Sequence, residues 1–93
     1  MAGQGGIIGD AAVDLVSMFS LVEDKLYTIQ NKSDYTLTIL AKASEPSPNS
    51  VIDNRDAQNL KSGQLAQIIY RGTDKIYVWF AAGSGPIAIV EAA

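Results

Sequence analysis

The chain has 93 residues, a net charge of −3, no cysteine and no histidine. This length suits one domain and is too short for two domains that each bury a core. The missing cysteine excludes disulfides, thiolate metal sites and a cysteine nucleophile. The missing histidine removes the commonest transition-metal ligand and the side chain that titrates near neutral pH. We therefore expect neither a metal nor a cofactor, and no enzymatic activity.

Hydrophobic residues make up 47% of the chain and charged residues 18%, whereas typical soluble domains are about 25% charged. This surplus of apolar surface favours burial against another subunit, and a well-packed monomer is the alternative. The ten acidic and seven basic residues form no block of either sign. A nucleic acid is therefore disfavoured as a partner, and so is an acidic surface that mimics DNA.

Residues 1–24 differ from the rest in composition, because they contain four acidic residues and no basic one. Four glycines in the seven residues from Gly3 to Gly9 disfavour a pre-set conformation. We predict a flexible N-terminal arm with an apolar segment over residues 1–24, followed by a single β-domain over residues 25–93. The arm carries no secretory signal pattern and its apolar stretch is too short to span a membrane, so we expect an intracellular protein without membrane contact.

Within this arm, Asp10 is positioned to cap a short helix. Val13, Val16 and Phe19 would share one apolar side of that helix. An extended arm that docks on a neighbouring molecule is the alternative.

From Lys25 onward, runs of β-branched and aromatic residues alternate with turn clusters. Two hairpins are predicted, one over residues 26–40 and one over residues 75–90, with turns at Lys61–Gln64 and Arg71–Asp74. Residues 44–50 contain two prolines and predict an exposed loop. The predicted strands cover residues 26–29, 35–40, 51–52, 65–70, 75–80 and 86–90. This pattern predicts an all-β fold, an antiparallel sandwich or a small jelly-roll-like barrel.

The strand predicted over residues 75–80 separates two kinds of side chain by alternation. Ile76, Val78 and Phe80 share one face, which is typical of a core. Tyr77 and Trp79 share the other face, which fits an interface or a covering segment better than a platform for stacking a ligand.

Three motifs were weighed as binding or modification sites. Asp53-Asn54-Arg55-Asp56 lacks the spacing and the glycine of a calcium loop. The glycine-rich start lacks a preceding strand and the third glycine of a dinucleotide-binding motif. Asn31-Lys32-Ser33 matches a glycosylation sequon but fits a turn better in a chain without a secretory signal.

Two segments carry short motifs that occur together in one group of proteins. The first is Leu26-Tyr27-Thr28-Ile29-Gln30-Asn31-Lys32-Ser33, in which a strand ends in a Gln-Asn-x-Ser motif. The second is Ile76-Tyr77-Val78-Trp79-Phe80-Ala81-Ala82-Gly83-Ser84-Gly85, with a late Tyr-Val-Trp motif. In these segments the chain resembles small bacteriophage virion proteins of the capsid decoration, or cement, type. The likeness covers about two-thirds of the chain and leaves out the arm and residues 44–60.

The resemblance implies a protein made in the host cytoplasm and located on the capsid surface of a virion. It would form a homotrimer and stabilise contacts between major capsid proteins. A receptor- or carbohydrate-binding module of a phage tail or fibre is the alternative, with the aromatic side chains facing the ligand. Our hypothesis for the contact surface consists of the apolar residues of the arm and two aromatic residues: Ile7, Ile8, Val13, Val16, Phe19, Tyr77 and Trp79.

Overall fold

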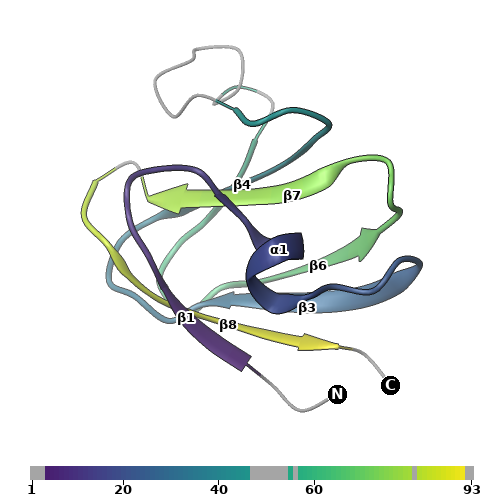
Figure 1. The fold of residues 1–93 in the computed structure, drawn as a ribbon. Helices are drawn as coiled ribbons and strands as arrows, with labels where there is room; N and C mark the ends of the chain where they lie inside the picture. Colours follow the sequence, from purple (N-terminus) through teal and green to yellow (C-terminus); the bar gives the residue numbers. More distant parts are fainter. Residues whose placement is uncertain (1–3, 47–54, 56, 81, 92–93) are drawn as a thin grey trace.

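The structure, a computed structural model, describes residues 4–46, 55, 57–80 and 82–91 (Figure 1). Its elements are eight β-strands and one short helix within these ranges. In chain order they are β1 (Gln4–Ile8), β2 (Val13–Asp14), α1 (Leu15–Phe19), β3 (Lys25–Asn31), β4 (Leu37–Lys42), β5 (Gln58–Leu60), β6 (Leu65–Tyr70), β7 (Lys75–Phe80) and β8 (Gly85–Glu91).

The strands form two four-stranded antiparallel sheets that pack as a sandwich. Sheet A has the order β1-β8-β3-β6 and sheet B the order β2-β7-β4-β5. The first strand pairs with the last, the second with the seventh, the third with the sixth and the fourth with the fifth. This is the pairing of one long hairpin rolled into two sheets, which is the jelly-roll arrangement. The prediction of an all-β sandwich or jelly-roll-like fold is confirmed.

The core lies between the two sheets because each strand presents alternate residues to it. Tyr27 and Ile29 of β3 face it from sheet A, and Val78 and Phe80 of β7 face it from sheet B. All four side chains are fully buried. The alternation predicted for residues 75–80 is therefore confirmed on its core side.

Both predicted hairpins are wrong, although their strands exist. β3 pairs with β6 and β8 in sheet A, whereas β4 pairs with β5 and β7 in sheet B. In the same way, β7 belongs to sheet B and β8 to sheet A. The chain crosses from one sheet to the other at both turns. Each strand has one apolar face, and packing the apolar faces of two sheets against each other buries more surface than a single flat hairpin does.

The first turn is fixed by a buried polar network around Asn31. The amide nitrogen of Asn31 donates to the carbonyl oxygens of Tyr35 and Leu60, and its side-chain oxygen accepts from the backbone nitrogen and the hydroxyl of Ser33. Leu60 belongs to sheet B, so this side chain connects the two sheets. The turn that we predicted for the Asn31-Lys32-Ser33 motif is present, and its asparagine is fully buried.

The structure differs from the predicted flexible arm, because residues 4–24 are built into the sandwich. β1 pairs with β8 through the backbone, an interaction that glycine makes as well as any residue. Gly6 also lies close to α1, since a Cβ there would lie 3.2 Å from Cζ of Phe19 and closer still to the flexible end of Met18, which would have to move. A glycine-rich sequence is compatible with a strand where another element approaches this closely.

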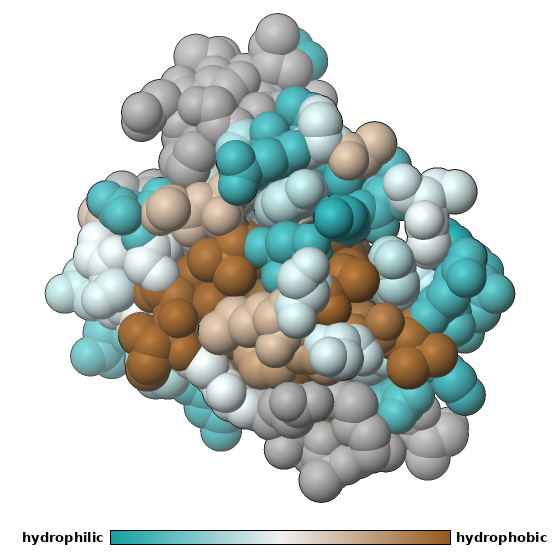
Figure 2. Space-filling model, viewed as in Figure 1, coloured by the Kyte–Doolittle hydropathy of each residue, from teal (hydrophilic) through white to brown (hydrophobic). Residues whose placement is uncertain are grey.

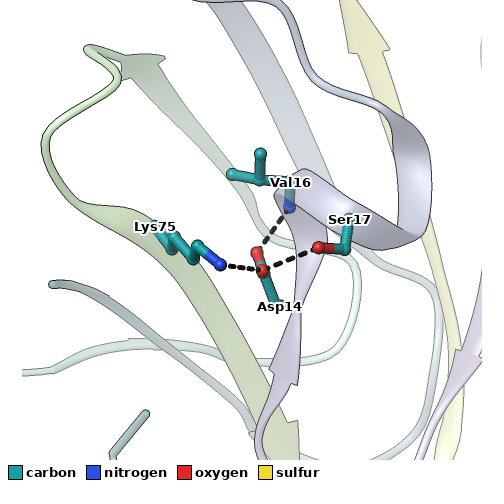
Figure 3. Close-up of polar contacts among 4 residues, drawn as sticks. All are labelled: Asp14, Val16, Ser17 and Lys75. Atoms are coloured by element: carbon teal, nitrogen blue, oxygen red, sulfur yellow. Dashed lines mark hydrogen bonds and ion pairs between the residues drawn. The ribbon is translucent and has the colours of Figure 1, made fainter. Parts of the chain in front are cut away.

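The predicted short helix exists as α1, but its cap is Asp14 and not Asp10 (Figure 3). Asp14 Oδ1 accepts from the backbone nitrogen of Val16 at 2.9 Å, and Oδ2 accepts from the hydroxyl of Ser17 at 2.9 Å. The ammonium of Lys75 lies 3.3 Å from the same carboxylate. Such a cap is worth about 1 kcal/mol, and here it also fastens α1 to β7.

The predicted turn at Lys61–Gln64 is confirmed and closes with a bulge. Gln64 donates its backbone N–H to Lys61 O, and Gly63 has the positive φ of 80° that the third position of such a turn requires. Gly63 N donates to Asn31 O, and Asn31 N donates to Gln64 O. This is a G1 bulge between β3 and β6.

The strand predicted at Val51-Ile52 and the calcium motif considered at Asp53–Asp56 lie outside the described residues, apart from Arg55. Across the described ranges, no helix combines the length and the hydrophobicity needed to cross a membrane.

Candidate functional site

The outer face of sheet A is the surface that we single out as the candidate functional site. The register of the four strands places alternate residues on it. At its centre, Thr28 of β3 lies between Val90 of β8 and Gln67 of β6. The members of this face are Gly5, Ile7, Leu26, Thr28, Gln30, Leu65, Gln67, Ile69, Pro86, Ala88 and Val90. We call this set the outer face of sheet A.

Two properties of the outer face are unusual for a surface exposed to water. No member carries a charge, and four large aliphatic side chains on it are exposed. These are Ile7 at 69%, Leu65 at 60%, Val90 at 44% and Ile69 at 41% exposed. Scattered exposed apolar residues are ordinary, but a contiguous uncharged set across four strands is typical of a protein contact surface.

The outer face of sheet B is different, because the chain covers part of it. Tyr77 and Trp79 form a second buried cluster there with Leu40, and Ala12 and Ala57 pack against this cluster. Trp79 is fully buried, and no group of the described residues forms a hydrogen bond with its Nε1. The sequence allowed an interface or a covering segment for this face of β7. In the structure, Tyr77 and Trp79 are covered by the chain itself.

The structure separates the seven residues of the predicted contact surface. Ile8 and Phe19 are buried in the main core, and Val13 and Val16 are partly buried against it. Tyr77 and Trp79 lie in the second cluster. Ile7 is the member that remains exposed, on the outer face of sheet A. In this conformation the other six are mainly internal contacts, because α1 and β1 pack on the sandwich instead of projecting from it.

The sequence analysis missed most of the outer face of sheet A. A signal was present, since no charged residue lies between Lys61 and Arg71 and none lies between Lys75 and Glu91. β6 therefore has no charge on either face and β8 has none before its last residue, Glu91, where a strand with one solvated face usually alternates apolar and charged residues. The contact surface was predicted in the arm instead, because apolar residues lie beside glycines there.

Further apolar side chains are exposed on the side of the molecule that carries α1. Met18 is 41% and Val22 is 53% exposed, and polar residues interrupt the hydrophobic ones on this side (Figure 2). It has two large exposed apolar residues, against four on the outer face of sheet A, and we give it no separate role.

No arrangement of catalytic or metal-binding groups stands out among the described residues. Within that part of the chain, no three acidic side chains are grouped so that they could hold a metal ion. The close polar contacts described above, at Asp14 and at Asn31, join elements of the fold to one another. They position α1 and the turn between the sheets.

Comparison with protein-family models, with curated proteins and with solved structures gives no match.

Proposed function

We propose that the protein is a non-enzymatic structural protein that binds a larger protein assembly through the outer face of sheet A. The assembly is the outer surface of a bacteriophage capsid, where the protein stabilises contacts between major capsid proteins. The observation that carries this proposal is the uncharged outer face of sheet A, on which β1, β6 and β8 expose four large apolar side chains.

Two further points support a virion role. The short motifs in β3 and β7 resemble capsid decoration proteins, and the jelly roll is common in viral capsid domains. The same fold also serves lectins, so the fold by itself does not decide between these roles. The surface favours a structural role, because an uncharged sheet face with exposed apolar side chains suits a protein partner better than a sugar.

The alternative of a carbohydrate- or receptor-binding module is less well supported. Its sequence argument depended on Trp79 and the tyrosines facing the ligand. Trp79 and Tyr77 are buried, at 0% and 6% exposed, and Tyr27 is buried as well, whereas Tyr35 is exposed. A ring stacks on a sugar only when its face is accessible. We therefore retain the structural role as the proposal.

A capsid-binding experiment tests this role with one charge placed at the centre of the face. In Thr28→Lys, an ammonium group would have to be desolvated on contact, so we expect binding to the phage's own capsids to fall by at least about tenfold. Binding is measured by co-sedimentation of the full-length protein with empty capsids over a range of concentrations.

The matched control is Thr73→Lys, which adds the same charge at an exposed position in the connection between β6 and β7. This variant should bind like the wild-type protein. Equal binding by Thr28→Lys and Thr73→Lys would refute the role of the outer face. A wild-type protein that does not sediment with capsids would refute the capsid as the partner.

A further inference from the structure

The open edge of β6 is a second feature that the proposed function does not use. Sheet A ends in β1 and β6, and sheet B ends in β2 and β5. β2 and β5 have two and three residues, and β1 contains Gly5 and Gly6. β6 has six residues, Leu-Ala-Gln-Ile-Ile-Tyr, without a charge, a proline or a glycine. It lacks the devices by which proteins protect an edge strand from pairing with other chains.

The backbone groups at this edge are identified by the bulge that precedes β6. Asn31 N donates to Gln64 O, so Asn31 and Gln64 are a hydrogen-bonded pair. Bonded and non-bonded pairs alternate along an antiparallel ladder. Ala66, Ile68 and Tyr70 therefore bond to β3, and Leu65, Gln67 and Ile69 direct their N–H and C=O groups away from it. Within the described ranges, no strand pairs with that side of β6.

These outward groups are self-complementary in one register. Residues directly opposite each other in an antiparallel pair point to the same face. If Gln67 lies opposite Gln67 of a second copy, Leu65 lies opposite Ile69 of that copy, and all three positions belong to the outer face. Each of the three opposed pairs exchanges two hydrogen bonds, roughly six in all. No like charges meet, because β6 carries none.

We propose that β6 pairs antiparallel with β6 of a second copy of this chain, about a twofold axis at Gln67. The two copies of sheet A then form one continuous eight-stranded sheet. The axis stands perpendicular to this sheet, so both outer faces point in the same direction. This pairing is independent of the capsid proposal, and it would double the surface that the proposed function offers to an assembly.

The contact is small. A six-residue strand is about 20 Å long, and one such edge buries less than the roughly 800 Å² per partner of a standard stable interface. We therefore expect a weak pair whose population rises with protein concentration. Antiparallel pairing of β6 with β6 of a second copy gives a closed dimer. The sequence resemblance implies a homotrimer instead.

A cysteine cross-link tests the register, because the chain has no cysteine of its own. In Gln67→Cys the two sulfurs meet across the axis, where Cα atoms of a bonded pair are about 5.5 Å apart and within disulfide reach. The full-length variant is oxidised in a glutathione buffer and the dimer is measured by non-reducing electrophoresis. We expect it to cross-link at least about tenfold faster than Ile69→Cys.

Ile69→Cys is the matched control, since position 69 lies on the same face of the same strand. In the proposed register, residue 69 of one copy lies opposite residue 65 of the other. The two cysteines at position 69 are therefore four residues, or about 13 Å, apart along the strand. A mixture of Leu65→Cys and Ile69→Cys should cross-link mainly as the mixed dimer. Equal rates for Gln67→Cys and Ile69→Cys would show random collision and overturn the proposal.

A charge variant tests the same pairing without oxidation. Gln67→Lys places two ammonium groups directly opposite each other, which opposes pairing. We expect the midpoint of dimerisation by light scattering to move to at least about tenfold higher concentration. Thr28→Lys, one strand further in, should leave that midpoint unchanged. An oligomer that persists unchanged in Gln67→Lys, including a trimer, would overturn the proposal, and circular dichroism confirms that each variant is folded.

Discussion

Asn31→Asp should destabilise the folded chain by about 3–5 kcal/mol at neutral pH, because the change places an unpaired charge in a buried site. Asn31 is 0% exposed, and its amide nitrogen donates to the carbonyl oxygens of Tyr35 and Leu60. A carboxylate oxygen in that position would face two acceptors and could donate to neither. The free energy of unfolding is measured by urea denaturation, followed by the fluorescence of the single tryptophan.

Asn59→Asp is the matched control for this chemical change. Asn59 is exposed, and its side-chain oxygen accepts from the hydroxyl of Thr38 at 3.1 Å. A carboxylate can accept the same hydrogen bond, so we expect a change within about 0.5 kcal/mol. If Asn31→Asp is as mild as Asn59→Asp, the buried network does not join the two sheets.

Trp79→Ala should cost about 3–5 kcal/mol of folding stability, which is the usual range for a buried aromatic side chain cut back to alanine. Trp79 is 0% exposed and packs with Tyr77 and Leu40 on the outer side of sheet B. A domain of this size has roughly 5–15 kcal/mol of stability in total, so the variant should unfold at much lower urea concentration. Far-UV circular dichroism reports the transition, since the variant has no tryptophan.

Trp79→Phe separates packing from hydrogen bonding at this position. The indole Nε1 has no hydrogen-bond partner among the residues that the structure describes, so phenylalanine removes volume without removing a hydrogen bond to any of them. We expect it to cost less than half as much as Trp79→Ala. A fully stable Trp79→Ala would contradict a buried role and would return this residue to the list of exposed binding candidates.

Local sequence pattern was sufficient to predict the strands but not their partners. β6 and β7 begin and end where the alternation and the flanking turns placed them. The pairing of β3 with β8 depends instead on contacts between residues 27–31 and 87–91, which are far apart in the chain. A short turn can join two strands of one hairpin or two strands in different sheets. The buried hydrogen bonds of Asn31 favour the second arrangement, and no local sequence pattern predicts them.

The N-terminal residues were interpreted as an arm for a similar reason. Glycine carries a large entropy cost when it is ordered, and Gly5 and Gly6 therefore suggested flexibility. Their role depends on β8, which pairs with them, and on Phe19, which packs closely over Gly6. Neither neighbour is visible from the composition of residues 1–9.

The candidate surface could have been found from the sequence by asking which strands lack charge altogether. β6 and β8 have none before Glu91, yet a strand without charge is equally typical of one buried on both faces. The exposure of Leu65, Ile69 and Val90 shows that no second layer of the described residues covers this side of sheet A. The distinction between a doubly buried strand and an exposed apolar one therefore required the structure.

The most direct test of the central claim is electron cryomicroscopy of the phage's capsids incubated with the full-length protein. The account predicts added density on the outer capsid surface, with the outer face of sheet A against the major capsid proteins. Bare capsids at saturating protein concentration, or bound copies whose outer face of sheet A points to solvent, would contradict it.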